Sequence, residues 1–323
     1  MGQIVESAHA KINLALDVGP VRPDGYHGIH TVMQSLELRD IVVLEERPAG
    51  ISLDCMPGDP LRQGARCSLE FDRDPLPPSN ARNLAWRAAE LLREAAGIRR
   101  GVHITIRKAI PLAAGLAGGS ADAAAVLRGL NRLWNLGMSR EELALVGVKV
   151  GADVPFCLLE GTAEATGIGE KLKPVPSPPA WTVLLLKLPV SVSTAACYKA
   201  YDELQNPPRV DAGRMLEALA SQDLTEVAKC LGNSLEAVTL KQVPELILWR
   251  EAMEEAGCLG VLMSGSGPTL FGLVRNEEHG HDVFERLVNT VKQERQGLLP
   301  NLYLTRFLSS KGNDEFEGGA WHA

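Results

Sequence analysis

The sequence predicts a two-domain protein in which strands and helices are mixed. Its 323 residues exceed the length at which a single hydrophobic core usually stops growing. Apolar and polar residues alternate over residues 8–18, as in a strand, whereas residues 84–95 carry apolar side chains at helical spacing. A proline-rich segment, residues 174–179, interrupts these patterns. Together, the three observations favour two mixed domains over one uniform core.

The domain change is expected beside this proline-rich segment. We assign residues 1–163 to the N-terminal domain and residues 164–308 to the C-terminal domain. The tail, residues 309–323, is polar and rich in glycine, so we expect it to be disordered.

Composition and charge narrow the class of protein. Hydrophobic residues make up 45% and charged residues 23% of the chain, which excludes disordered and fibrous classes. The net charge of -7 argues against a nucleic-acid partner, because nucleic acids bind basic surfaces. The six cysteines form no C-x-x-C pair, the N-terminus has no signal-peptide core, and no apolar run could span a bilayer. We therefore expect a cytoplasmic protein with no membrane partner, of undetermined oligomeric state.

Residues 8–18 predict the first strand. Lys11 and Asn13 share one face of it, because side chains alternate between the two faces of a strand. A lysine in the middle of a strand commonly belongs to the solvated face of a sheet. Lys11 gains a functional meaning only if a phosphate lies opposite it.

A turn at residues 23–25 is followed at once by Tyr26 and His27. Because aromatic residues make up only 5% of the chain, this pair could form a platform for the ring of a ligand. A tyrosine at the edge of a core is an equally ordinary interpretation. Residues 40–46 predict a second strand, and residues 48–78 predict a surface excursion rich in proline and glycine.

The next elements lead into a glycine-rich segment. Residues 84–95 form one apolar helical stripe, opened by Asn83, and residues 102–106 alternate as a strand. The segment PLAAGLAGGSADAAA follows, at residues 111–125. Apolar residues at helical spacing behind it place the start of a second helix near Ser120.

This glycine-rich segment is interpreted as a phosphate cradle. Gly115, Gly118 and Gly119 can adopt positive φ and let backbone amides approach a ligand closely. The helix N-terminus behind them presents unpaired N–H groups and partial positive charge, which suit a polyphosphate. Neither a Walker A motif nor a G-x-G-x-x-G fingerprint is present. A tight strand-to-helix turn without a ligand is the alternative that the segment alone leaves open.

One carboxylate is prominent in the following segment. Ser139 and Glu142 have the spacing of a capping box, which predicts a helix from there to about Val150. Asp153 follows in GADVPF, among small and apolar residues, where an ionised carboxylate is costly unless it is paired. A role in a turn or as a helix N-cap is the other interpretation.

The second half of the chain predicts a strand over residues 181–188 and helices over residues 210–220 and 243–256. Ser193 or Thr194 can cap a further helix. Two short apolar strands enclose the loop SGSGP, residues 264–268. Both a plain hairpin turn and a ligand-binding loop are open interpretations of this loop.

In this order, the segments resemble those of the GHMP kinase superfamily. The three family motifs correspond to AHAKINLALDV, PLAAGLAGGSADAAA and SGSGPTLF. RPDGYH, NLAWRAAELL, VGADVPF and GIGEKL are similar to segments of a member kinase that acts on a cytidine-diphosphate-linked alcohol in the non-mevalonate isoprenoid pathway. The likeness covers residues 8–172 and continues to Phe271. The chain departs from the pattern in the longer excursion at residues 48–78 and in its tail.

The resemblance implies a two-domain α+β fold, with an active site in the interdomain cleft that phosphorylates the 2-hydroxyl of the alcohol. It implies ATP and Mg2+ as cofactors, with the metal held mainly by the ATP phosphates and its protein ligands unassigned. It places Lys11 and Asp153 in the catalytic positions. The implied ATP site consists of Asn83, Leu84, Lys108, Pro111, Gly115, Leu116, Ala117, Gly118, Gly119, Ser120 and Ala121. The implied substrate site consists of Asn13, Tyr26, His27, Thr194, Gly265, Ser266 and Gly267.

Two other functions remain as alternatives. A kinase scaffold can serve as a non-catalytic nucleotide or metabolite sensor, because a fold does not determine function. The presence of both Lys11 and Asp153 weighs against this alternative. A kinase for mevalonate or homoserine is disfavoured, because a substrate without a base gives Tyr26 and His27 nothing to stack on.

Overall fold

The structure is a computed structural model that describes residues 2–68, 76–293, 298–309 and 321–322. The strands are β1 (Gln3–Val21), β2 (His27–Arg47), β3 (Ile51–Pro57), β4 (Arg66–Cys67), β5 (Gly101–Lys108), β6 (Thr162–Thr166), β7 (Lys171–Val175), β8 (Thr182–Lys187), β9 (Gly232–Asn233), β10 (Gly260–Met263), β11 (Thr269–Leu273), β12 (Asn301–Arg306) and β13 (Trp321–His322). The helices are α1 (Leu84–Ala95), α2 (Gly118–Leu133), α3 (Arg140–Val150), α4 (Val154–Leu159), α5 (Thr194–Asp202), α6 (Ala212–Ser221), α7 (Leu224–Cys230), α8 (Glu236–Gln242), α9 (Glu245–Ala256) and α10 (Glu277–Gln293). Strands and helices are thus mixed in both halves of the chain, as predicted.

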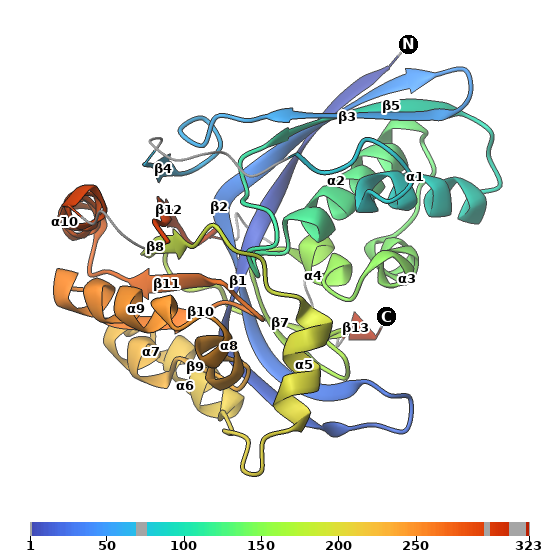
Figure 1. The fold of residues 1–323 in the computed structure, drawn as a ribbon. Helices are drawn as coiled ribbons and strands as arrows, with labels where there is room; N and C mark the ends of the chain where they lie inside the picture. The colour runs from blue at the N-terminus through green and yellow to red at the C-terminus, as the bar shows by residue number, and fades with distance from the viewer. Residues whose placement is uncertain (1, 69–75, 294–297, 310–320, 323) are drawn as a thin grey trace.

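Two sheets organise the described residues (Figure 1). The first sheet has the order β13-β7-β6-β2-β1-β9, and β5 pairs with both β2 and β3. The second sheet has the order β10-β11-β8-β12-β4. Helices α1 to α4 gather on one side of the long strands β1 and β2, whereas α7, α9 and α10 lie against the second sheet (Figure 1). Helix α6 packs against β1 and β2 as well. Each sheet therefore has its own covering helices.

The two long strands extend well beyond the predicted ranges. The alternating pattern predicted residues 8–18 and 40–46, whereas β1 spans Gln3–Val21 and β2 spans His27–Arg47. Nearly every residue in the middle of both strands is buried. The missed part of β2, residues 27–39, is mostly buried, and a strand covered on both faces need not alternate between apolar and polar residues.

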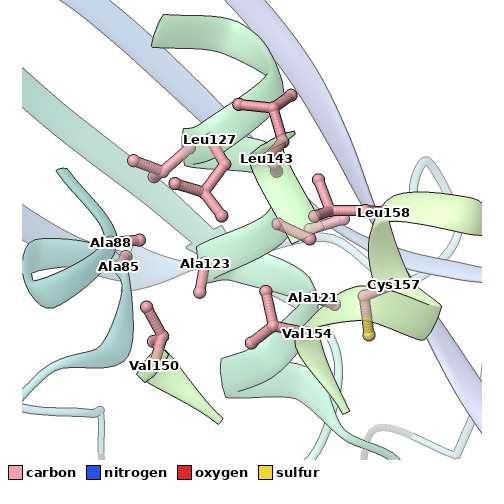
Figure 2. Packing of buried hydrophobic residues seen from close by; sticks show 14 of the residues in the cluster. Ala85, Ala88, Ala121, Ala123, Leu127, Leu143, Val150, Val154, Cys157 and Leu158 are labelled. Atoms are coloured by element: carbon pink, nitrogen blue, oxygen red, sulfur yellow. The ribbon is translucent and has the colours of Figure 1, made fainter. Parts of the chain in front are cut away.

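Small side chains let the helices of the first half pack closely. Figure 2 shows Ala121 and Ala123 of α2 beside Val150 and Val154, which come from α3 and α4. A Cβ added at Gly147 of α3 would lie 2.8 Å from Val154 Cγ1, so the glycine permits this approach. The dense packing holds the N-terminus of α2 in a defined position.

The predicted helix caps are confirmed. Asn83 accepts a hydrogen bond from the amide of Ala85 at the start of α1. Ser139 and Glu142 form the predicted capping box at α3. Ser193 caps α5 by accepting from the Ala196 amide. These caps were predictable because their partners lie within three residues along the chain.

The chain passes from the first sheet to the second between β7 and β8. The predicted boundary at 163/164 falls inside β6, and β6 and β7 both belong to the first sheet. The second sheet begins with β8, after the proline-rich segment 174–179. In addition, β4 of the 48–78 excursion pairs with β12 of the second sheet. The excursion therefore connects the two sheets.

Most of the tail that we predicted to be disordered, residues 310–320 and 323, lies outside the described residues. Within it, β13 (Trp321–His322) pairs with β7 in antiparallel orientation. Backbone pairing of this kind depends on a partner about 150 residues away in the sequence, so local composition could not indicate it. In the described part of the chain, no helix is both long and apolar enough to cross a membrane.

Candidate active site

A cavity of about 910 Å³ lies where the first sheet, the glycine-rich loop and α5 meet. From the predicted sites it is lined by Lys11, Asn13, Tyr26, His27, Leu84, Pro111, Gly115, Ala117, Gly118, Gly119, Ser120, Asp153, Thr194, Gly265, Ser266 and Gly267. Most of the residues that the sequence analysis assigned to catalysis, ATP and substrate are thus brought to one cavity, although they come from distant parts of the chain.

The glycine-rich loop reaches its shape differently from our expectation. Gly115 has φ of 73°, but the other positive φ values of the loop belong to Ala113 and Ala117, at 48° and 56°. Gly118 and Gly119 are instead the first residues of α2, which starts two residues before the predicted Ser120. A Cβ at Gly118 would lie 3.0 Å from Ile110 Cγ2, which is a tight contact, whereas one at Gly119 would lie 3.4 Å from Leu84 Cδ1, at ordinary van der Waals distance.

The N-terminus of α2 is open toward the cavity. Its N-cap residue, Ala117, offers no side chain to accept from the first amides of the helix. Gly118, Gly119 and Ser120 carry these amides, and all three residues line the cavity. Helix N-terminal amides without a capping side chain, together with the helix dipole, are suited to an anion.

The SGSGP loop and strand β1 hold this glycine-rich loop in place. The Ser264 hydroxyl donates to the Gly115 carbonyl oxygen at 3.0 Å, and the Lys11 amide donates to the Leu116 carbonyl oxygen at 3.1 Å. A Cβ at Gly115 would lie only 2.1 Å from the Ser264 carbonyl oxygen, so no other residue fits between the loops. Leu116 and Ala121 themselves are buried beneath the loop and do not reach the cavity.

Gly115→Ala is expected to weaken ATP binding about 10- to 150-fold, because displacing the loop removes hydrogen bonds to a charged ligand worth about 1.5–3 kcal/mol. Gly137→Ala is a matched control: Gly137 also has a positive φ, 66°, but a Cβ there meets nothing within 4 Å. The control therefore carries the backbone strain without the clash. Nucleotide titration of both variants measures the difference, and equal affinities in the two would contradict a phosphate role for the loop.

Lys11 and Asp153 face each other in the cavity. Lys11 Nζ lies 3.7 Å from Asp153 Oδ2 and donates to Asn13 Oδ1 at 2.8 Å. Asn13 in turn donates to the Thr31 hydroxyl at 2.9 Å, which fixes the orientation of its amide. Lys11 is only 5% exposed, so it does not belong to a solvated sheet face. The sheet interior therefore directs a buried ammonium group toward the cavity.

Asp153 occupies the N-cap position of α4, which was one of the two roles considered for it from the sequence. Its side chain, however, makes no cap hydrogen bond. The side chain is 40% exposed and lines the cavity. The apolar residues around it in the sequence pack away from it, into the core. The carboxylate is thus accessible to a ligand and is not a buried charge.

The opposite end of the cavity is aromatic. Tyr26 is 62% exposed and lines the cavity, so it does not pack beneath its turn. His27 is buried, with its ring centroid 5.1 Å from that of Tyr198. His27 Nδ1 lies 2.8 Å from the Gly19 carbonyl oxygen, and Nε2 lies 3.1 Å from Asp202 Oδ1. Both ring nitrogens therefore already have partners, which favours an orienting role for His27 over hydrogen bonding to a base.

Tyr198 and Asp202 line the cavity and were missed by the sequence analysis. Both lie on α5, four and eight residues after Thr194, so all three share one face of the helix. The helical spacing of Tyr198 and Asp202 from Thr194 was visible in the sequence. Because Thr194 was already a predicted substrate-site residue, this spacing could have indicated that both residues face the site. Burial raises the pKa of the Tyr198 hydroxyl, so this ring remains neutral.

The late loop SGSGP is both a hairpin turn and a wall of the cavity. β10 and β11 pair in antiparallel orientation on either side of it, and Gly265 and Gly267 have positive φ. The Ser266 and Thr194 hydroxyl oxygens lie 3.0 Å apart. Asn233 Nδ2 donates to the Gly265 carbonyl oxygen at 2.7 Å. These bonds fix the loop against α5 and β9.

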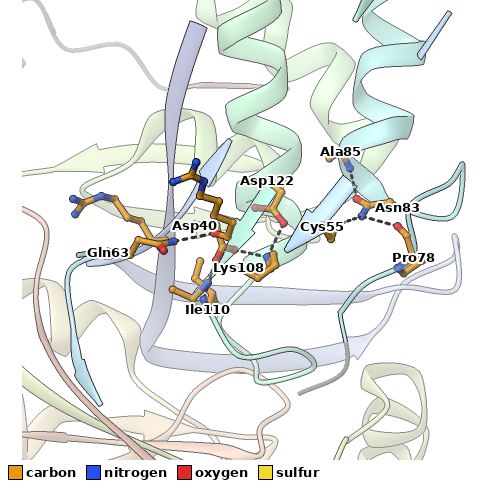
Figure 3. A network of polar contacts seen from close by, with 12 residues as sticks. Asp40, Cys55, Gln63, Pro78, Asn83, Ala85, Lys108, Ile110 and Asp122 are labelled. Carbon is orange, nitrogen blue, oxygen red and sulfur yellow. Dashed lines mark hydrogen bonds and ion pairs between the residues drawn. The ribbon is translucent and has the colours of Figure 1, made fainter. Parts of the chain in front are cut away.

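Besides Leu116 and Ala121, two further predicted ATP-site residues do not reach the cavity. Lys108 is buried between Asp40 and Asp122, and Asn83 donates to the Pro78 carbonyl oxygen while capping α1 (Figure 3). Neither residue lines the cavity, whereas Leu84, predicted with them, does. The opposing charges that surround Lys108 were not visible in the sequence, because Asp40 lies 68 residues away.

Comparison with known proteins identifies the family. The family models described as GHMP kinases N terminal domain and GHMP kinases C terminal match residues 83–161 and 215–293. A 4-diphosphocytidyl-2-C-methyl-D-erythritol kinase of Exiguobacterium sibiricum is 45% identical, over 94% of this chain and 98% of that protein. The chain belongs to this family of GHMP kinases. A protein of the same name from Pelotomaculum thermopropionicum is 47% identical, over 90% of this chain and 96% of that one.

Solved structures agree with this family assignment. A crystal structure of a 4-(cytidine 5'-diphospho)-2C-methyl-D-erythritol kinase superposes with a TM-score of 0.75 and 34% identity, covering 94% of this chain and 99% of that chain. A homoserine kinase from Cytophaga hutchinsonii shares the fold with a TM-score of 0.70 at 18% identity, covering 96% of both chains. The predicted two-domain α+β GHMP fold is confirmed. The chain is a small-molecule kinase that uses ATP to phosphorylate an alcohol.

Proposed function

We propose that this kinase transfers the γ-phosphoryl group of ATP to the 2-hydroxyl of 4-diphosphocytidyl-2-C-methyl-D-erythritol, giving the 2-phosphate and ADP. One observation carries the proposal: a single cavity joins an open helix N-terminus, the Lys11–Asp153 pair and an aromatic end. The names of the relatives support the choice of acceptor. The reaction belongs to isoprenoid precursor biosynthesis, and we place it in the cytoplasm on the sequence grounds given above.

The residues around the glycine-rich loop fit the phosphates of ATP. Gly118, Gly119 and Ser120 direct uncapped amides into the cavity, and Leu84 offers apolar surface beside them. Mg2+ would be held mainly by phosphate oxygens, since this ion usually keeps few protein ligands and takes substrate phosphates instead. When bound, the metal offsets charge on the phosphates. We assign it no protein ligand.

Lys11 and Asp153 supply the chemistry in this proposal. Phosphoryl transfer depends mainly on positioning and on stabilisation of charge. Asp153, exposed to the cavity, orients the acceptor hydroxyl or accepts its proton. Lys11, held by Asn13, offsets charge on the transferred group. The distance of 3.7 Å between the two side chains leaves the carboxylate free to contact a hydroxyl.

Substrate choice is the direct test of this function. ADP release is measured with the cytidyl alcohol, mevalonate and homoserine as acceptors at equal concentration. We expect turnover with the cytidyl alcohol alone, because only this acceptor carries a base for the aromatic end of the cavity. Turnover of mevalonate or homoserine at a comparable rate would overturn the choice of acceptor. Nucleotide binding without turnover of any acceptor would favour the sensor function.

Tyr26→Ala is expected to raise KM for the cytidyl alcohol about fivefold to a hundredfold, because stacking a base on an aromatic ring is worth about 1–3 kcal/mol. The exposed ring of Tyr26 lies at the cavity and not in the core, so thermal stability and KM for ATP should stay unchanged. Turnover should change less than KM, since stacking far from the reacting hydroxyl contributes similarly in ground and transition states. An unchanged KM would remove Tyr26 from the site.

A further inference from the structure

Three ionisable side chains meet beneath the glycine-rich loop, in the buried interior of the first half of the chain. Lys108 Nζ contacts carboxylate oxygens of both Asp40 and Asp122, the latter at 2.6 Å (Figure 3). Asp40 is 0% and Asp122 2% exposed. The mechanism proposed above does not use this cluster, and none of its members lines the cavity.

The cluster joins the two ends of the loop. Asp40 Oδ1 accepts from the amides of Ala109 at 2.6 Å and Ile110 at 2.9 Å, where the chain leaves β5 and enters the loop. Asp122 lies in the first turns of α2, where the chain leaves the loop. Lys108 links the two carboxyl groups. Contacts among these three side chains therefore hold both ends of the loop, in addition to the bonds from Ser264 and the Lys11 amide.

The charges of the cluster do not balance if all three groups are ionised. Two carboxylates against one ammonium leave one net negative charge in a site with almost no solvent, which is costly. Two ionised carboxylates cannot form a hydrogen bond with each other, because neither carries a proton to donate. In addition, Asp122 Oδ1 has no hydrogen-bond partner among the described residues. One proton shared between the carboxyl groups would remove the net charge and supply a donor.

We propose that Asp40, Lys108 and Asp122 form a neutral anchor for the phosphate loop, in which Asp122 holds a proton at neutral pH. Asp122 is a positioning residue that acts on ATP through the loop and does not touch it. The part of this inference that concerns ATP rests on the proposed phosphate role of the loop. The protonation of Asp122 does not, and it is tested without any ligand.

The surroundings of Asp122 favour its protonated form. Burial raises its pKa, the Lys108 ammonium lowers it and the Asp40 carboxylate raises it again; together they move the pKa from the ordinary 3.8 to about 8. Among the described residues, Cys55 of β3 also faces Asp122, and burial raises the pKa of its thiol to about 11. Cys55 is therefore neutral over the same pH range and does not compete for the role.

Infrared difference spectroscopy on the ligand-free full chain tests the proton directly. At pH 7 the wild type should show the carbonyl stretch of a protonated carboxylic acid, and Asp122→Asn should lack it. Since asparagine resembles a protonated aspartate in shape and charge, Asp122→Asn should melt within about 2 °C of the wild type. If Asp122 were ionised, removing its charge would break a buried ion pair and lower Tm by about 6 °C or more.

The pH dependence of Tm gives a second, independent test. If the pKa of Asp122 is higher in the folded protein than in the unfolded chain, its protonation stabilises the folded protein at low pH. This stabilisation is lost as the pH rises from the unfolded-state pKa toward the folded-state pKa. Between pH 6 and pH 8, Tm of the wild type should therefore fall by about 2 °C per pH unit relative to Asp122→Asn. A constant difference between the two proteins over this range would overturn the proposal.

Asp17→Asn is the matched control. Burial raises the pKa of Asp17, but hydrogen bonds from Arg209 and from the Val210 amide outweigh it and hold the pKa below its ordinary value. Asp17 is therefore ionised and paired at neutral pH. Its asparagine variant should melt about 4 °C below the wild type at pH 7. An equal loss in Asp17→Asn and Asp122→Asn would mean that both carboxyl groups are ionised.

The effect on ATP separates positioning from a merely structural role. When Asp122 loses its proton at alkaline pH, the anchor gains a negative charge close to the phosphate loop. KM for ATP should then rise about threefold or more between pH 7 and pH 9 in the wild type, with kcat changing less, and stay level in Asp122→Asn. If the spectroscopic and thermal results hold but this rise is absent, the anchor does not act on ATP and the positioning role is refuted.

Discussion

Asp153→Asn is expected to lower kcat for the cytidyl alcohol about a hundredfold to ten-thousandfold, the usual loss when a general base is removed. Asparagine keeps the shape of the side chain but cannot accept the proton of the acceptor hydroxyl. KM for ATP and thermal stability should change little, because the side chain is 40% exposed and makes no cap hydrogen bond to α4. Steady-state kinetics and thermal melting measure both quantities.

Asp202→Asn is a suitable control for this prediction. Asp202 also lines the cavity, and its side chain is 45% exposed, close to the value for Asp153. It contacts His27, however, at the aromatic end. We expect this variant to raise KM for the cytidyl alcohol and to leave kcat within about threefold of the wild type. A near-normal kcat in Asp153→Asn would refute the assignment of Asp153.

Lys11→Met is expected to lower kcat about a hundredfold to a thousandfold, the loss typical of removing one preorganised group that stabilises charge in a transition state. Methionine fills a similar volume, so the packing of β1 should be retained. The substitution leaves Asn13 Oδ1 without its donor, which costs about 1–3 kcal/mol of stability. Melting curves recorded with the kinetics separate this loss from the loss of rate.

Lys229→Met controls for the removal of a lysine as such. Lys229 lies on α7, away from the cavity, and pairs with Glu226 at 2.8 Å on the surface. An exposed pair of this kind contributes little, so rate and stability should stay near those of the wild type. If Lys11→Met retained kcat within about fivefold of the control, the charge on Lys11 would have no part in phosphoryl transfer.

The proposed neutral anchor and the proposed catalytic pair, Lys11 and Asp153, differ in how their lysine is surrounded. Lys11 has a carboxylate partner that solvent and substrate can reach, so its charge remains available to the cavity. Lys108 is enclosed by two carboxyl groups that are themselves buried, so its charge is paired inside the protein and is not exposed to the cavity. The sequence resemblance placed both lysines at the active site. Of the two, Lys11 lines the cavity, whereas Lys108 is enclosed by carboxyl groups and does not.

Local features of the chain were predictable because their causes lie within a few residues. The caps at Asn83 and at Ser139 depend on amides two or three positions away. The glycine-rich loop and the helix behind it were predictable from the glycines and from the helical spacing of the residues that follow. The order of the motifs was enough to indicate the family. These features depend on residues that are close in the sequence or on the order of motifs along the chain. They can therefore be predicted without knowledge of the tertiary contacts.

Other features depend on residues that only the fold brings together. The short strand β13 pairs with β7, and β4 pairs with β12 of the second sheet. The ring of Tyr198 lies beside that of His27, although the two residues are far apart in the sequence. Sequence periodicity carries no information on such pairings, since the same pattern suits many partners.

The site shows the same division. Residue types that suit phosphate, proton transfer and a base were evident in the sequence, as Gly115, Asp153 and Tyr26 illustrate. Whether a polar side chain reaches the cavity was decided by long-range packing: Lys11 does so from a strand that is buried on both faces, whereas Lys108 is turned inward by Asp40. The physical reason is that exposure and charge pairing are properties of the whole fold, whereas chemical type belongs to each residue.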